Sequence, residues 1–396
     1  MTRQTPLEEL RFVDRAHVLA HGNPVGELTR SPAGEVTFRY TADYAGPPVA
    51  TTLPAHGPPL SLPGGGLPPF FAGLMPEGRR LSLLRREVKT SMDDELSLLL
   101  AVGADTPGAV QIVPAGQHAA EPSPLADGDI SDLDFRQIGA EIDRHAIPGV
   151  QAKASASRLT APLTTSEERA LLKIEPAELP FLALNESMHL RAARLLNLPV
   201  AQSRLVQDRH GVPGLIVRRF DRSVTENGAV VRLPLEDAGQ VLGILPAAKY
   251  SVATEDLIRA VAGQCAAPVI AARNLYLQFL FAWLTGNGDL HATNISILQR
   301  EPGRWEVSPL YDVACTAVYR DFTMALPVGG RVSRIRARHW AELADFIGLR
   351  PAAARRADGI ALRAAAAVGL HEIPLEGSPI NGALREIRGR RAELEH

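Results

Sequence analysis

Strict alternation of apolar and polar residues near the beginning of the chain predicts β-strands. Within residues 34–40, Val36, Phe38 and Tyr40 alternate with charged or hydroxyl-bearing side chains, which is typical of a strand with one buried face. Residues 16–28 contain an apolar run that a Gly-Asn-Pro turn interrupts, and they too predict strands. We therefore expect the fold to begin with a small sheet.

Residues 45–69 break the alternation with eight prolines and five glycines in 25 positions. This segment has too many turn formers and too few backbone donors for a regular element, so it predicts a loop or a linker. Helical spacing follows in residues 70–88 and again in residues 91–103. Ser91 is the expected N-cap of the second helix, and Gly103 is its expected end.

A short apolar run at 108–114 predicts another strand, and the Pro-, Gly- and Ala-rich stretch 114–128 predicts a domain boundary near residue 120. After it we expect a capped helix at 131–144 and a polar, glycine-containing loop at 147–160. The chain of 396 residues is long for a single core, so two domains are expected and three are possible.

The second half of the chain is predicted to be mostly helical after a group of strands. The predicted strands are 169–176, 200–207 and 214–220, with an amphipathic helix at 185–198 between the first two. Residues 236–285 are expected to be mostly helix and to end in a buried, nearly all-apolar helix. Beyond it, 295–298 and 305–310 predict a short hairpin, and the Ala- and Arg-rich last 60 residues have helical spacing.

Composition narrows the class of protein. The formal net charge of -2 excludes a global positive field for direct binding to nucleic acid. Cys265 and Cys315 are the two cysteines, and their separation predicts neither a disulfide framework nor a zinc site, as in a reducing compartment. No secretory or membrane-spanning pattern is present, so we expect a cytoplasmic protein that does not bind membranes; residues 394–396 resemble the start of an affinity tag.

The stretch GNGDLHATN at 286–294 carries the chemical signal. Asp289 and Asn294 are five residues apart. Asp312 lies 18 residues after Asn294, beyond the predicted hairpin. In protein kinases an aspartate accepts the substrate proton, an asparagine five residues later binds magnesium, and a later aspartate completes the metal site. Magnesium prefers such hard oxygen ligands and fills the rest of its shell with water and phosphate.

A lysine in an apolar strand supports the same interpretation. Lys173 lies within the strand-like sequence RALLKIEP, where lysine is rarely buried without a partner, and a phosphate group is a possible partner. Glu186, at the start of the next predicted helix, is a possible partner that would orient the lysine. The preceding loop offers backbone N–H groups and Lys153 for phosphates.

Each of these residues also has a structural interpretation. Asp289 and Asn294 could form turn hydrogen bonds after a helix, and Lys173 could extend its ammonium group from a strand to solvent. Tyr311 with Asp312 could simply end a strand, and an isolated His291 is more often structural than catalytic. A metal-dependent hydrolase built on Asp289, His291 and Asn294 would leave Lys173 without a task. The order of the segments therefore favours a kinase.

Several motifs in order resemble the HipA-like serine/threonine kinases, the toxins of bacterial toxin–antitoxin modules. The motifs that carry the resemblance are VGEL, FFAGLMPEGRR, GVQAK, LLKI, RRFDR, LPLEDAGQVLG, GNGDLHATN and PLYD, and they span most of the chain. The resemblance implies an α+β, bilobal protein-kinase-like fold. Residues 1–120 would form a β-rich N-terminal domain, 121–235 the part with the phosphate loop and the strand lysine, and 236–393 a helical lobe with the catalytic loop.

The resemblance also implies roles for individual residues. Asp289 would be the catalytic base, and Asn294 and Asp312 would bind Mg²⁺. The residues expected around ATP are Gln151 and Lys153 in the phosphate loop, Lys173 at the phosphates, Phe220 at adenine, Asp221 near the ribose, and His291 and Tyr311 beside the nucleotide. Family members commonly carry a serine whose autophosphorylation silences the kinase, and this chain has Ala146 at that position. Regulation would then use another device, such as Ser155 or Ser157, unless Ala146 is an engineered change.

The expected activity is ATP- and Mg²⁺-dependent phosphorylation of a protein serine or threonine, with growth arrest as its result. The resemblance implies a translation component such as an aminoacyl-tRNA synthetase as substrate, and a HipB-like helix-turn-helix antitoxin as partner. Contact with DNA would then be indirect, through the antitoxin, which suits the net charge. The alternative is a non-catalytic co-repressor that binds the antitoxin on operator DNA.

Overall fold

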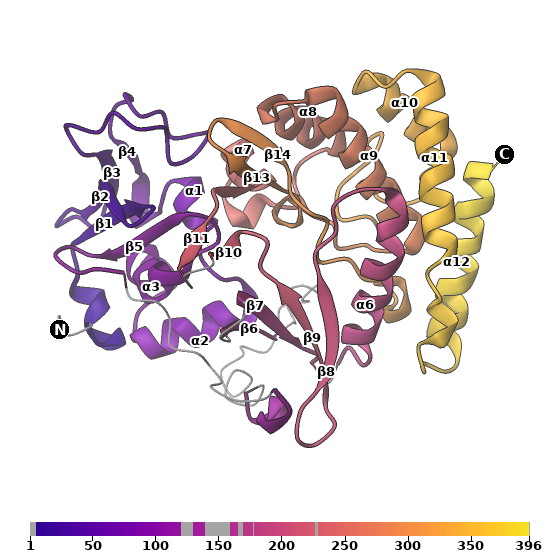
Figure 1. The fold of residues 1–396 in the computed structure, drawn as a ribbon, viewed down its shortest axis with the longest axis horizontal. Coiled ribbons are helices and arrows are strands. Elements are labelled where there is room, and N and C mark those ends of the chain that lie inside the picture. The colour runs from indigo at the N-terminus through magenta and orange to yellow at the C-terminus, as the bar shows by residue number, and fades with distance from the viewer. Residues whose placement is uncertain are drawn as a thin grey trace.

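The N-terminal domain is built on a five-stranded antiparallel sheet, as the alternating pattern predicts. The computed structural model describes residues 5–119, 130–138, 159–164, 169–176, 178–225 and 229–395. The sheet has the order β4-β3-β2-β1-β5, and Figure 1 shows it at the left. Its strands are β1 (Arg15–Ala20), β2 (Asn23–Arg30), β3 (Val36–Tyr40), β4 (Leu60–Leu62) and β5 (Val110–Pro114).

Three helices follow β4 and share one hydrophobic core with the sheet. They are α1 (Pro69–Ala72), α2 (Gly78–Val88) and α3 (Glu95–Val102). Phe38 and Phe71 are fully buried where sheet and helices meet, with ring centroids 4.9 Å apart. Each such aromatic side chain contributes a few kcal/mol of burial free energy, so this contact stabilises α1 against the sheet.

Two local predictions for this domain are wrong. The segment 45–69 contains β4, because Leu60 and Leu62 pair with β3 in spite of the neighbouring prolines. The helix predicted to start at Ser91 starts later, because Asp94 is its N-cap and accepts a hydrogen bond from the Ser97 N–H at 3.3 Å. The predicted end at Gly103 is confirmed.

A four-stranded antiparallel sheet with the order β6-β7-β9-β8 forms the second part. Its strands are β6 (Leu159–Thr164), β7 (Arg169–Ile174), β8 (Ser203–Gln207) and β9 (Pro213–Arg218), which confirms the predicted Lys173-bearing strand. Helix α6 (Leu182–Ala193) lies against β8 and β9. Of the helix predicted at 131–144 and the loop at 147–160, most residues lie outside the described ranges, as does the predicted boundary near residue 120.

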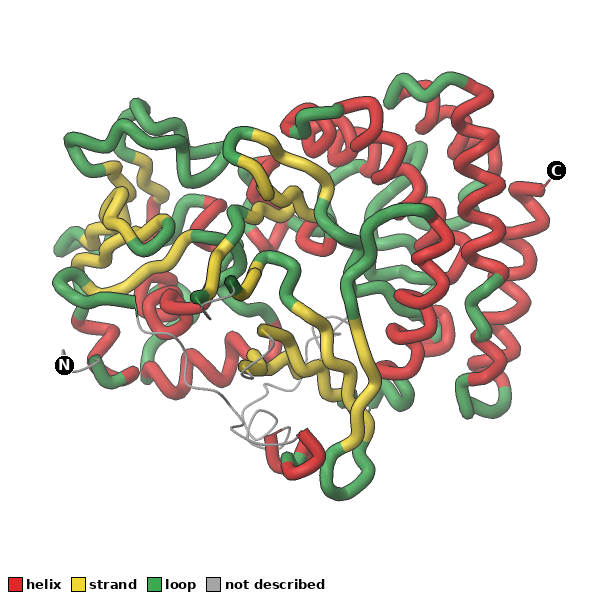
Figure 2. Tube along the Cα trace, viewed as in Figure 1, coloured by secondary structure: helices red, strands yellow, loops and turns green. Residues whose placement is uncertain are grey.

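Two small sheets connect this part to the helical lobe. β10 (Arg222–Val224) pairs with β11 (Val230–Arg232), a hairpin that the sequence pattern did not predict. The predicted hairpin after the stretch 286–294 is confirmed as β13 (Ser296–Glu301) and β14 (Arg304–Val307), and β12 (Leu235–Asp237) pairs with β13. Figure 2 shows these strands between the N-terminal domain and the helices.

The remaining lobe is helical, as predicted, and α9 is its centre. The lobe contains α7 (Ala238–Leu242), α8 (Thr254–Gln264), α9 (Pro268–Thr285), α10 (Ala337–Phe346), α11 (Pro351–Ala366) and α12 (Ser378–Glu395). Helix α9 is buried from Leu275 to its end, whereas Val269 and Ile270 in its first turn are exposed. Leu394 continues α12 and packs against the core of this lobe. Among the described residues, no helix has the length and apolar character required to cross a bilayer.

A buried carboxyl group joins the N-terminal domain to β12. Glu236 accepts hydrogen bonds from the backbone N–H and the hydroxyl of Thr51, both at 2.8 Å. Burial raises the pKa of Glu236 to about 7, although the two hydrogen bonds from Thr51 act in the opposite direction. The folded protein therefore binds a proton at this site more tightly than the unfolded chain does.

Glu236→Gln is expected to reduce the pH dependence of stability. The contribution of this group is complete below the unfolded pKa of about 4.5 and is lost as the pH rises through about 7. Between pH 5.5 and pH 8, the wild type should lose about 1–2 kcal/mol more of unfolding free energy than the variant. Urea unfolding at both pH values measures this difference, and equal losses would contradict the assignment.

Candidate active site

The stretch 286–294 forms a buried polar turn directly after α9. Gly286 ends the helix in the left-handed region at a φ of 72°, which glycine adopts without strain. The Asn287 side chain accepts a hydrogen bond from the Asp289 N–H at 2.9 Å. The Asn294 side-chain amide donates to the backbone carbonyl of Asp289 at 2.9 Å. The five-residue spacing therefore closes a rigid turn that holds Asp289 and Asn294 at its two ends.

Two aromatic side chains surround the Asp289 carboxylate. The Tyr250 hydroxyl donates to Asp289 Oδ1 at 3.4 Å, and His291 Nε2 lies 3.9 Å from the same oxygen. The rings of Tyr250 and His291 meet edge to face, with centroids 5.0 Å apart. His291 Nδ1 in turn lies 3.0 Å from the Thr293 hydroxyl, which fixes the ring orientation. Tyr250 was not predicted, because no local pattern links residue 250 to the turn.

Lys173 joins three parts of the fold. Its ammonium group lies 2.7 Å from Glu186 Oε1 in α6 and 2.9 Å from Asp312 Oδ1 beyond β14. Glu186 is buried, and Asp312 has a left-handed φ of 54°, an uncommon conformation for a residue with a side chain. The structure thus brings together Lys173, Glu186 and Asp312, which are far apart in the sequence.

A cavity of about 330 Å³ lies beside Lys173, between the N-terminal domain, the four-stranded sheet and the polar turn 286–294. Its walls combine apolar, aromatic, cationic and acidic side chains, which include Met75, Arg80, Pro107, Leu171, Lys173, Val217, Phe220, Asp237, Thr293 and Tyr311. Cavities of this size with a few convergent polar groups are typical ligand sites. The N-terminal domain contributes one wall of this cavity, which includes Met75, Arg80 and Pro107.

Phe220 and Tyr311 form the aromatic part of the cavity wall. Their ring centroids are 5.5 Å apart with an interplanar angle of 47°. The Tyr311 hydroxyl lies 2.6 Å from the Ser296 hydroxyl and donates to the Thr293 carbonyl at 2.9 Å. Burial raises the pKa of Tyr311, so the ring presents a neutral face at physiological pH. Such a face can stack on a heteroaromatic base.

The carboxylate of Asp221 is already occupied by arginines and a backbone amide. Its Oδ2 accepts hydrogen bonds from Arg219 at 2.9 Å, Arg222 at 2.7 Å and the Gly108 N–H at 2.9 Å. Burial raises the pKa of Asp221, but the neighbouring Arg219 and Arg222 outweigh this effect and lower the pKa to about 2. Asp221 lines the cavity, but its carboxylate holds the N-terminal domain to the sheet, and its predicted place near a ribose stays a prediction.

Arg219 and Arg222 also bind Asp105, a carboxylate of the N-terminal domain, as does Arg232. Asp105 lies 2.8 Å from Arg219, 3.1 Å from Arg222 and 3.0 Å from Arg232. This cluster was not predicted, although the arginines beside Asp221 in RRFDR are a sequence signal for it. A second ion pair across the same boundary joins Lys249 to Glu77. The Asp105–arginine cluster and the Lys249–Glu77 pair both link the N-terminal domain to the rest of the chain.

The oxygen ligands expected for magnesium fit that ion. Asp312 offers a carboxylate, and the Asn294 amide, which donates through its nitrogen, has its oxygen available as a ligand. Within the described ranges, no three side chains of His, Cys, Asp or Glu gather as a metal cage. A cation here would accordingly need water or phosphate as further ligands. The predicted phosphate-loop residues Gln151, Lys153 and Ala146, and Ser155 and Ser157, lie outside the described residues.

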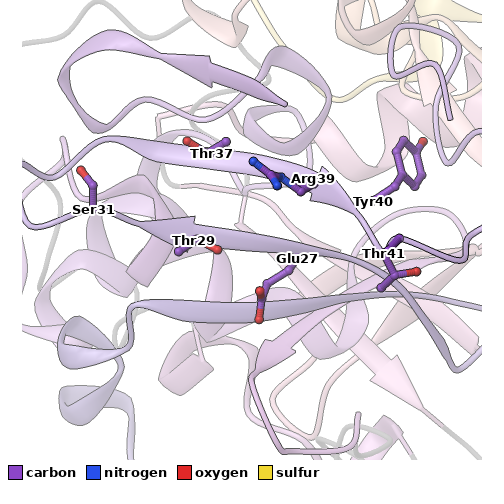
Figure 3. A pocket seen from close by; sticks show the side chains of 8 residues that line it. Glu27, Thr29, Ser31, Thr37, Arg39, Tyr40 and Thr41 are labelled. Atoms are coloured by element: carbon purple, nitrogen blue, oxygen red, sulfur yellow. The ribbon is translucent and has the colours of Figure 1, made fainter. Parts of the chain in front are cut away.

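A separate hollow of about 540 Å³ lies on the polar face of the N-terminal sheet, lined by side chains such as Thr29, Thr37 and Arg39 (Figure 3). Figure 3 shows these side chains spread along neighbouring strands instead of converging. Glu27 in this hollow already pairs with Arg15 at 2.8 Å. The hollow therefore lacks the convergent groups that the cavity beside Lys173 has.

Comparison with known proteins identifies two matching family domains. Residues 16–113 match the HipA N-terminal domain, and residues 145–368 match the HipA-like C-terminal domain. The chain is 30% identical to a putative kinase of Sinorhizobium fredii over 347 residues, which cover 79% of this chain and 80% of that protein. It is 27% identical to the serine/threonine-protein kinase toxin HipA of Shewanella oneidensis, over 76% of this chain and 75% of the toxin.

A solved structure agrees with the family match. The HipA chain in a complex of HipA, HipB and operator DNA from Shewanella oneidensis superimposes with a TM-score of 0.75 and 23% sequence identity, over 96% of both chains. This likeness confirms the expected bilobal, kinase-like α+β fold. With the two matching domains and the related sequences, it shows that the chain belongs to the HipA-like kinase family.

Proposed function

We propose that the protein is an ATP- and Mg²⁺-dependent serine/threonine protein kinase, the toxin of a HipA/HipB-like toxin–antitoxin module in the cytoplasm. The observation that carries this proposal is the contact of Lys173 with both Glu186 and Asp312 at the edge of a cavity. In kinases, the strand lysine pairs with a helix glutamate and faces the phosphates, and an aspartate holds the metal. A purely structural ion pair would not require the adjoining cavity or the turn that holds Asp289.

In the proposed reaction, Asp289 accepts the proton of the substrate hydroxyl. The hydroxyl oxygen bonds to the γ-phosphorus of ATP while the bond from that phosphorus to the leaving oxygen of ADP breaks. Asn287 and Tyr250 orient Asp289 for this task. Asn294 and Asp312 would hold Mg²⁺, which supplies charge neutralisation for the phosphates when bound. Lys173 neutralises further phosphate charge, and Phe220 and Tyr311 bind the adenine end.

The identity of substrate and partner is supported more indirectly. Family membership supports a translation component such as an aminoacyl-tRNA synthetase as the phosphorylated protein. The relative from Shewanella oneidensis was solved with HipB and operator DNA, which supports a helix-turn-helix antitoxin as partner here. The net charge of -2 supports DNA contact through that antitoxin. The same complex favours the second candidate function, a co-repressor without catalysis.

Asp289→Asn is expected to reduce phosphotransfer by about 10²-fold to 10⁴-fold, because the amide cannot accept the substrate proton. Transfer of labelled phosphate from ATP to proteins of a bacterial extract measures this, and ATP affinity should change little. Asp256→Asn, at an exposed carboxylate of α8, is the matched control and should keep full activity. Wild-type protein that transfers no more phosphate than Asp289→Asn would instead favour the co-repressor.

Asp312→Ala is expected to weaken ATP binding at least about tenfold in Mg²⁺ and to abolish the effect of Mg²⁺ on affinity, because it removes the only carboxylate among the proposed ligands. Calorimetric titration with and without Mg²⁺ measures both effects. The fold should survive, since Lys173 keeps Glu186 as a partner. An unchanged response to Mg²⁺ would contradict the metal assignment.

A further inference from the structure

Asp237 is a cavity carboxylate that the proposed reaction does not use. It ends β12 and is the N-cap of α7, where its Oδ1 accepts the Gln240 N–H at 2.8 Å. The Gln240 side chain returns a bond by accepting the Asp237 N–H at 2.8 Å. This capping box fixes the direction of the carboxylate. In the described part of the chain, no lysine, arginine or histidine forms an ion pair with it.

The neighbours of Asp237 place it beside the aromatic part of the cavity. Asp237 is paired in register with Ser296, whose hydroxyl lies 2.6 Å from that of Tyr311. It lines the same cavity as Phe220 and Lys173. Burial raises the pKa of Asp237 to about 7 despite its backbone hydrogen bonds, and the nearby Glu77 adds to this effect. The carboxylate therefore has fewer donors around it than an ionised group requires.

Charge determines which part of a nucleotide can lie against Asp237. Lys173 attracts a triphosphate, whereas Asp237 offers it no positive charge, so the phosphates belong at the lysine. The purine belongs against the rings of Phe220 and Tyr311. The part between base and phosphates is a sugar, whose hydroxyls are neutral donors. Asp105 and Asp221, the other aspartates of the cavity, already accept hydrogen bonds from arginines, so Asp237 is the aspartate with the most capacity for a further donor.

We propose that Asp237 accepts hydrogen bonds from the ribose hydroxyls of the bound nucleotide and so makes the site selective for ribonucleotides over deoxyribonucleotides. This inference rests on the proposed function, because it needs a nucleotide in the cavity. A hydroxyl that donates to Asp237 stabilises its ionised form, and the resulting charge-assisted bond is among the stronger hydrogen bonds in proteins. An analogue without the hydroxyl leaves the carboxylate without that donor, so discrimination is expected to be large.

The test compares the binding of ATP, 2′-deoxy-ATP and 3′-deoxy-ATP to the full chain in Mg²⁺ by calorimetry. Wild-type protein should bind ATP at least about tenfold more tightly than one of the deoxy analogues, which corresponds to about 1.4 kcal/mol. Asp237→Asn and Asp237→Ser should bind ATP and that analogue within about twofold of each other. Both replacements are good N-caps, so α7 should remain intact.

The outcomes separate this inference from the proposed function. Wild-type protein that binds ATP and both deoxy analogues equally, or Asp237 variants that keep the wild-type ratio, would overturn the role of Asp237 alone. Wild-type protein that binds no nucleotide would overturn the proposed function as well. Asp221→Asn is the matched comparison: it should lower the unfolding midpoint and keep the wild-type ratio of affinities, and a lost ratio would move the ribose contact to Asp221.

Discussion

A buried ammonium group must have anionic partners, and this requirement organises the centre of the molecule. Transfer of a lysine from water into the protein costs several kcal/mol unless a carboxylate accompanies it. The Lys173 side chain is 11% exposed, and it meets two carboxylates, Glu186 at 1% and Asp312 at 18% exposure. Because these groups come from β7, α6 and the segment after β14, their pairing fixes the position of the four-stranded sheet relative to the helical lobe.

The same requirement explains how the N-terminal domain is attached. Asp105 of the N-terminal domain pairs with three arginines of the second part, two of which also pair with Asp221, and Glu77 pairs with Lys249, so charged groups on one side of the boundary find partners on the other side. Loss of one partner in such a cluster leaves an uncompensated buried charge, which typically costs 3–5 kcal/mol. The N-terminal domain is thereby held as one wall of the cavity beside Lys173. In the proposed kinase it would be part of the nucleotide site.

Local patterns were sufficient wherever one segment determines its own conformation. Lys173 stands out because it interrupts the apolar positions of a strand, and GNGDLHATN because it follows an apolar helix with a glycine stop. Both segments have the predicted structure. The pattern failed at Ser91, where Asp94 provides the cap, and in 45–69, where pairing with β3 creates a strand that the prolines argue against. Tertiary contacts outweigh propensities of a few tenths of a kcal/mol.

What the sequence determined by itself is the order of the strands, helices and polar motifs, since hydrophobic period and spacing depend on neighbouring residues only. It also carried the family resemblance. The tertiary structure alone decided which charged groups meet: that Asp312 lies on Lys173, that Asp221 is occupied by arginines, and that Asp237 lines the cavity. Such contacts join residues many positions apart, and they follow from the packing of whole elements, which no local window of sequence contains.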